Sequence, residues 1–88
     1  MDTKKIIGWN IRRLRVAKGL SQERLALEAG IDRSYVGRIE RGTENVTVSA
    51  LETLALVLDV PVADLFSGFD ASASRPLPLP SGRKPRVR

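Results

Sequence analysis

The stretch from Ser21 to Gly42 constrains the fold of this chain more than any other, because it carries start and stop signals for two short helices. Ser21 and Asp32 are favoured N-cap residues, and the apolar residue before each of them can pack onto the first helical turn. Gly30 and Gly42 each supply the left-handed residue that ends a helix. These signals agree with one another and predict two helices joined by a tight turn.

The two predicted helices each have an apolar inner side. The residues expected to point inward are Leu25, Ala26, Ala29, Ile31, Val36 and Ile39. The outward side of the second helix carries arginine, serine and tyrosine. This arrangement is typical of a helix-turn-helix, here over about residues 21–41, which places its second helix in the major groove of DNA.

Helical periodicity continues on both sides of this motif, and we expect an all-α fold of five helices. The first helix spans residues 4–17, with its apolar face at Ile7, Ile11 and Leu14. The fourth spans residues 48–58 after the N-cap Thr47, with its core face at Leu51, Leu54, Ala55 and Leu58. Pro61 opens a short fifth helix.

Charge is distributed unevenly along the chain. Residues 1–41 hold ten Lys/Arg and five Asp/Glu, whereas residues 42–66 hold four Asp/Glu and no Lys/Arg. Residues 67–88 hold five Lys/Arg and one Asp. A polyanion would therefore be attracted to the first half of the domain and repelled by the second.

The composition disfavours enzymes and metal proteins. The chain has no cysteine and no histidine, which excludes disulfides and removes the commonest metal ligand and general base. There is also no phosphate-binding loop and no pair of carboxylates in a pocket-like context. We expect no catalytic site, no metal and no cofactor.

The composition changes after about residue 67. Four of the five prolines lie near the C-terminus, at Pro76, Pro78, Pro80 and Pro85. We expect a domain over residues 1–67, followed by a flexible Pro/Arg-rich tail over residues 68–88. The basic residues of the tail could add non-specific DNA affinity or form an inert end.

The motif and its flanks resemble a known family. Ser21–Gly42, the pattern GxNIRxLR at Gly8–Arg15 and the stretch DRSYVGRIERGTENVTVSALETLALVL are similar to the Cro/C1-type helix-turn-helix regulators, also called the xenobiotic-response-element family. They also resemble the controller proteins of restriction–modification systems. The resemblance covers about Ile6 to Phe66. It implies a lambda-repressor-like bundle that binds operator DNA as a homodimer. The expected location is the bacterial cytoplasm, at the nucleoid, for a gene of bacterial, phage or plasmid origin.

The resemblance also implies roles for particular residues. Gln22 occupies a phosphate-contacting position, and Arg33, Ser34 and Arg38 occupy the base-reading positions of the second helix of the motif. Asn45 matches a position that contacts the DNA backbone.

Arg15 and Glu40 match a structural ion pair between the first and third helices.

For other residues, the sequence alone leaves more than one role open. Arg33 and Arg38 can bind guanine O6 and N7, bind phosphate, or form a solvated face. The ring of Tyr35 can pack while its hydroxyl reaches a phosphate, or it can pack only.

Two further arginines, Arg12 and Arg41, are expected to supply phosphate contacts without base selectivity.

Gly37 interrupts the middle of the recognition helix. It can let the backbone approach DNA closely, or it can be a tolerated surface position.

A homodimer is expected through the acidic side of the domain. Leu56 lies on the polar side of the fourth helix and indicates a second contact surface. The expected dimer residues are Leu56, Val60, Val62, Leu65 and Phe66. The alternative is that most of them complete the core of a single protomer.

The function expected from these features is that of a sequence-specific DNA-binding regulator, acting as a repressor or autoregulator on a pseudo-palindromic operator. The alternative is an antitoxin-like or controller-type protein whose tail binds a protein partner. RNA binding is disfavoured because no aromatic stacking platform is present.

Overall fold

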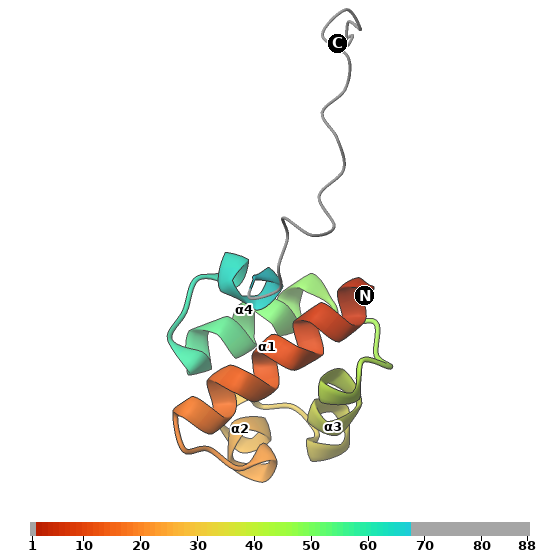
Figure 1. Ribbon diagram of the computed structural model, residues 1–88. Coiled ribbons are helices and arrows are strands. Elements are labelled where there is room, and N and C mark those ends of the chain that lie inside the picture. Colours follow the sequence, from red (N-terminus) through yellow and green to blue (C-terminus); the bar gives the residue numbers. More distant parts are fainter. Residues whose placement is uncertain (1, 68–88) are drawn as a thin grey trace, which may run out of the picture.

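The computed structural model describes residues 2–67, and these residues form four α-helices and one 3-10 helix (Figure 1). In chain order the elements are α1 (Thr3–Ala17), α2 (Gln22–Ala29), α3 (Arg33–Arg41), α4 (Val48–Leu58) and η1 (Val62–Phe66). The all-helical prediction is confirmed for this range. The tail predicted over residues 68–88 lies outside the described residues.

The short fifth helix predicted after Pro61 is a 3-10 helix, so the count of five α-helices is not confirmed. The backbone N–H of Asp64 donates to the Pro61 carbonyl at 2.9 Å, which is an i→i+3 bond. With five residues, η1 has the short length at which this tighter geometry is common.

Most of the predicted helix ends are confirmed. The side chains of Ser21 and Thr47 accept hydrogen bonds from the first turns of α2 and α4 at 2.9 and 3.0 Å. Gly30 and Gly42 are left-handed, with φ of 69° and 77°. Asp32 occupies the N-cap position of α3 but its side chain makes no capping hydrogen bond, so the prediction that it caps the helix is only half right.

The helix-turn-helix buries five of the six side chains that were predicted to form its inner face, and the sixth, Ile31, is partly buried against the core. Leu25, Ala26 and Ala29 of α2 and Val36 and Ile39 of α3 are all buried. They join a single core with residues from the other helices, namely Ile7, Ile11, Leu51, Leu54, Ala55, Leu58 and Leu65. Burial of each large aliphatic side chain stabilises the fold by about 1.5–3 kcal/mol.

Leu65 corrects one prediction. It is 0% exposed and belongs to the core, so it is unavailable as a dimer contact. The reason is that η1 turns back against both α1 and α4 and points Leu65 between them. Val60 is half-buried and also packs against the core.

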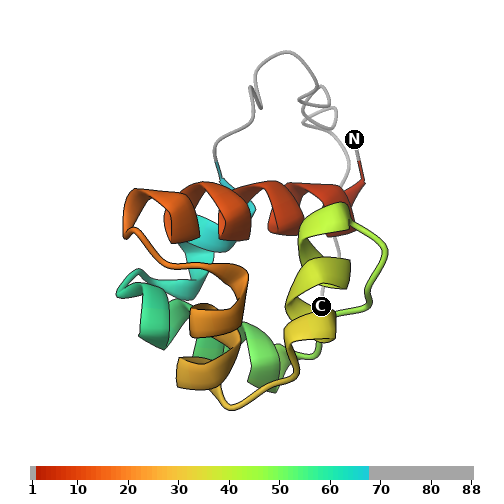
Figure 2. The same ribbon diagram turned by 90° about the horizontal axis from the view of Figure 1, so that it is seen from below.

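The arrangement of the helices puts α2 and α3 on one side of the molecule. α1 packs against α3 and η1, and α2 packs against α3 and α4. Figure 1 shows α2 and α3 below α1 with η1 above it, and Figure 2, seen from below, shows α2 and α3 nearest the viewer. The outer surface of α3 is therefore left uncovered by the other helices.

One buried polar side chain joins the two ends of the described chain. Asn10 is 0% exposed, and its amide N–H groups donate to the carbonyls of Ile6, Leu65 and Ser67. Its oxygen accepts from Arg13 at 2.8 Å. Asn10 is satisfied on both sides, as a buried polar group must be.

The contact between α1 and α3 depends on the absence of a side chain at Gly8. A Cβ there would lie 2.2 Å from the Ile39 carbonyl oxygen and 2.9 Å from that of Glu40. Both are backbone atoms, so neither can move without shifting α3.

We predict that Gly8→Ala destabilises the protein by about 2 kcal/mol in urea unfolding, because overpacking outweighs the gain in helix propensity. Gly37→Ala is the matched control in another helix interior. Its Cβ would meet only the end of the Arg41 side chain, at 3.3 Å. This variant should be neutral or up to about 1 kcal/mol more stable. Equal effects of the two substitutions would contradict the close approach at Gly8.

Candidate nucleic-acid interface

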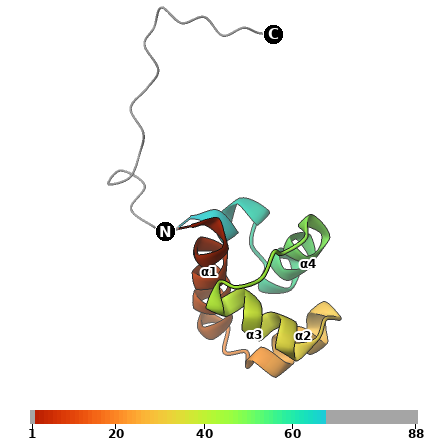
Figure 3. The same ribbon diagram turned by 90° about the vertical axis from the view of Figure 1, so that its right-hand side faces the viewer.

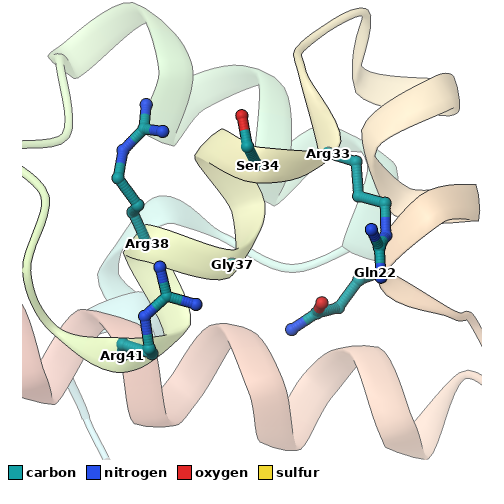
Figure 4. Close-up of a pocket in the computed structure, with 6 residues that line it drawn as sticks. All are labelled: Gln22, Arg33, Ser34, Gly37, Arg38 and Arg41. Carbon is teal, nitrogen blue, oxygen red and sulfur yellow. The ribbon is translucent and has the colours of Figure 1, made fainter.

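The outer face of α3 and the start of α2 together form a hollow that faces solvent (Figure 4). Its volume is about 240 Å³. The residues that line it are Gln22, Arg33, Ser34, Gly37, Arg38 and Arg41. The structure therefore brings together the three predicted base-reading residues and the predicted phosphate-contacting Gln22.

The hollow follows from the amphipathic pattern of α3. Val36 and Ile39 are buried on one side of the helix, which turns Arg33, Ser34 and Arg38 to the other side, where they are exposed. Gly37 lies among them without a side chain and forms the floor of the hollow (Figure 4). Figure 3 shows α2 beside α3, and Gln22, the first residue of α2, lines the same hollow.

The charge of this surface is positive. Three of its six lining residues are arginines, namely Arg33, Arg38 and Arg41. The first turn of α2 also presents backbone N–H groups, and the start of a helix favours anions. The arrangement suits a polyanion that offers both phosphates and hydrogen-bond acceptors.

The predicted ion pair between Arg15 and Glu40 is present and lies behind this surface. Arg15 Nε and Nη2 donate to the two oxygens of Glu40 at 2.6 and 3.0 Å. The Glu40 side chain is 3% exposed and that of Arg15 is 12% exposed. Arg15 Nη1 also donates to the Leu20 carbonyl at 2.8 Å, which ties the loop before α2 to α1.

Gln22 differs from its prediction in one respect. Its amide Nε2 donates to Glu40 at 3.0 Å, so this N–H group is engaged inside the domain. Gln22 thus belongs both to the hollow and to the ion-pair cluster. The sequence did not indicate this second role, because it depends on the crossing of α2 over α3.

The Glu40 hydrogen bond raises the pKa of Arg15 above its ordinary value, and this effect exceeds the opposing effect of burial. A raised pKa in a basic group means that its stabilising contribution is complete below the unfolded pKa and is lost only above the folded pKa. For Arg15 that loss falls in strongly alkaline solution. Arg15 stays charged at every pH at which the protein would be studied.

Arg38 makes a second ion pair, which sequence reasoning missed. Its Nε donates to Glu44 at 2.7 Å, and its guanidinium carbon lies 5.7 Å from the centroid of the Tyr35 ring. Tyr35 is half-buried and packs against the core. Glu44 lies in the loop after α3, where no helical spacing relates it to Arg38.

Three of the predicted DNA-contacting residues do not line the hollow, namely Tyr35, Asn45 and Arg12. Asn45 is exposed in the loop between α3 and α4. Arg12 lies on the outer side of α1, where it lines a separate hollow of about 310 Å³ with Trp9, Arg13 and Val16. The guanidinium of Arg13 covers the ring of Trp9 there, at 5.3 Å from the centroid.

Within residues 2–67, no cluster of three or more acidic side chains is placed to hold a metal ion. No helix in the same range is long and apolar enough to cross a membrane.

The chain belongs to the helix-turn-helix family of Cro/C1-type regulators, whose profile matches residues 11–65. Control protein C.SmaI of Serratia marcescens is 43% identical over 67 residues, which cover 76% of this chain and 80% of the relative. The crystal structure of the restriction-modification controller protein C.AhdI from Aeromonas hydrophila superposes with a TM-score of 0.70 at 49% identity. That match covers 72% of this chain and 96% of C.AhdI.

A third relative has been crystallised with DNA. SinR, a master regulator for biofilm formation, matches with a TM-score of 0.67 at 40% identity, over 69% of this chain and 98% of the SinR chain. The family predicted from the sequence is confirmed by all of these similarities.

We predict that Arg15→Met lowers the free energy of unfolding by about 3–5 kcal/mol, because it leaves the Glu40 carboxylate buried without its cation. The double variant Arg15→Met with Glu40→Leu should recover much of this loss, since no buried charge remains. Urea unfolding measures both. A double variant that is less stable than the single one would contradict this account.

Proposed function

We propose that this protein binds double-stranded DNA sequence-specifically as a homodimer and regulates transcription, as a repressor or autoregulator. Each protomer inserts α3 into a major groove, with half-sites about 34 Å apart on a pseudo-palindromic operator. The observation that carries the proposal is the solvent-facing hollow over α3, which gathers Arg33, Ser34 and Arg38 around the floor at Gly37.

Different parts of the hollow would have different tasks. Arg33 and Arg38 have the length and the paired N–H donors needed to reach guanine O6 and N7. Arg41 and the first turn of α2 would bind phosphates and set the register of the protein on the duplex. Asn45 and Arg12, which lie outside the hollow, would add contacts to the DNA backbone.

Regulation of a restriction–modification system is the specific role that the relatives favour. Three of them bear the name control protein, C.SmaI, C.BamHI and C.MunI, and C.AhdI is a restriction-modification controller. In this role the protein would bind DNA upstream of its own gene and cover promoter elements. No catalytic site is expected from the sequence, so we propose a binding protein and not an enzyme.

The second copy would bind across α4 and η1. Leu56 is 79% exposed, Phe66 44% and Val62 37%, and all three lie on this side of the domain. This is also the part of the chain that carries only acidic charge, so a second copy there stays clear of the basic hollow. The antitoxin-like alternative, in which residues 68–88 bind a protein partner, would use a segment outside the described residues.

We predict that Arg33→Ala and Arg38→Ala each weaken binding about tenfold or more, since each bidentate contact to guanine is worth about 1–3 kcal/mol. Footprinting of the DNA upstream of the protein's own gene measures this. Arg24→Ala is the control, because Arg24 is an exposed arginine of α2 that does not line the hollow. If both test variants protect the same site as well as the wild type does, α3 does not read the DNA.

We predict that Leu56→Asp converts the dimer to a monomer, since it places a charge in the centre of an apolar contact that is already acidic. Sedimentation equilibrium measures the change. The fold should be unaffected because Leu56 is exposed, and circular dichroism checks this. A variant that remains dimeric would move the interface away from α4.

A further inference from the structure

Arg38 is held from two sides on the surface of the hollow. Its Nε donates to the Glu44 carboxylate at 2.7 Å, with the two side chains 44% and 24% exposed. Its guanidinium also lies over the ring of Tyr35, at 5.7 Å from the centroid. Arg33, Arg38 and Arg41 all line the hollow, and within residues 2–67 Arg38 is the one of the three that is ion-paired.

The backbone after α3 brings Glu44 to this place. Gly42 turns the chain with φ of 77°, and the backbone N–H and the hydroxyl of Thr43 both donate to the Arg38 carbonyl, at 3.1 and 3.2 Å. Gly42 itself packs so closely on Lys5 of α1 that a Cβ would lie 2.6 Å from the Lys5 side chain. The position of Glu44 is thus set by the fold and not by a flexible loop.

The hydrogen bond to Glu44 occupies one edge of the Arg38 guanidinium and fixes the orientation of the other edge. Glu44 binds the Nε–H, so the terminal nitrogens of Arg38 remain for a second planar partner (Figure 4 shows this end of Arg38 projecting from α3). A long side chain normally loses rotamer freedom when it binds, and a side chain that is already held loses less. Bidentate recognition of guanine needs this kind of fixed plane.

We propose that Glu44 is a specificity-determining positioning residue: it aims Arg38 at a guanine of the half-site and keeps it from binding phosphates indiscriminately. The inference rests on the proposed function, since it assigns a task within DNA recognition. Glu44 itself touches no base.

Glu44 would have opposite effects on general DNA affinity and on discrimination between sequences. The Glu44 carboxylate places a negative charge beside a surface that meets a polyanion, so it weakens binding to every DNA sequence. Positioning of Arg38 strengthens binding only where the guanine is present. Removing the charge of Glu44 should therefore raise non-specific affinity and lower discrimination at the same time.

The test uses the full chain and a library of randomised DNA duplexes. Wild-type protein selects a preferred duplex. Each guanine of that duplex is then replaced in turn by 7-deazaguanine, which lacks the N7 acceptor. One guanine should stand out: its replacement weakens binding by the wild type but does not change the affinity of the Arg38→Ala variant. This is the guanine that Arg38 reads. Affinities for the selected, the replaced and a random-sequence duplex are measured by fluorescence anisotropy at one fixed salt concentration.

For Glu44→Gln we expect binding to the random duplex to tighten about twofold to threefold, as one exposed charge is removed. Its preference for the intact guanine over 7-deazaguanine should fall about fivefold relative to wild type. Glu28→Gln is the matched control: it removes the same charge and breaks the 2.6 Å Arg24–Glu28 pair on α2, away from the hollow. It should leave the guanine preference unchanged.

The other outcomes separate the two proposals. If the wild type selects no sequence, the proposed function fails. If it selects one, but no guanine responds as described or Glu44→Gln keeps the wild-type preference for N7, the role of Glu44 is overturned while sequence-specific binding stands. If Glu44→Gln tightens the selected and random duplexes equally, Glu44 acts as a repelling charge only, which also overturns positioning.

Discussion

The buried carboxylate of Glu40 is the constraint around which the helix-turn-helix is arranged. It projects from α3 and receives hydrogen bonds from Arg15 of α1 and Gln22 of α2, and Arg15 in turn binds the Leu20 carbonyl before α2. Apolar contacts alone would tolerate small rotations of one helix over another. A charge with fixed donors on two other helices does not, because any displacement leaves it unpaired in a place that water does not reach.

This cluster connects the core to the hollow over α3. α3 is rotated so that Val36 and Ile39 enter the core, and Gly8 lets its C-terminal half approach α1 to backbone contact. The opposite side of α3 then has only one orientation in which to present Arg33, Ser34 and Arg38. The geometry of the hollow is therefore set in part by Gly8, Arg15 and Glu40, which do not line it.

The sequence predicted those parts of the fold that depend on neighbours along the chain. The caps at Ser21 and Thr47 and the left-handed stops at Gly30 and Gly42 are local signals, and the structure contains all of them. The stop at Asp59, also left-handed with φ of 60°, was missed because aspartate is an uncommon residue there. The inner faces of the helices were also predicted correctly from their spacing.

What the sequence could not predict are contacts between residues far apart along the chain. Leu65 was assigned to a dimer surface because nothing local shows that η1 folds back over the core. Asn10 lies on the inner face of α1, where a polar residue indicates that hydrogen-bond partners must exist. Two of these partners lie at the other end of the domain, so the sequence did not identify them. The Arg38–Glu44 pair required the turn at Gly42 to be known first. The Arg15–Glu40 pair was predicted only through family resemblance.

The hydrogen bonds of Asn10 have a consequence for where this domain can be cut. Its amide needs the carbonyls of Leu65 and Ser67, so a chain shortened before residue 67 would lose more than a few terminal contacts. A cut before residue 67 removes the Ser67 carbonyl, and a cut before residue 65 also removes the Leu65 carbonyl, so that the Asn10 amide keeps only the Ile6 carbonyl of its own helix. Asn10 thus ties the middle of α1 to the last residues of the described chain.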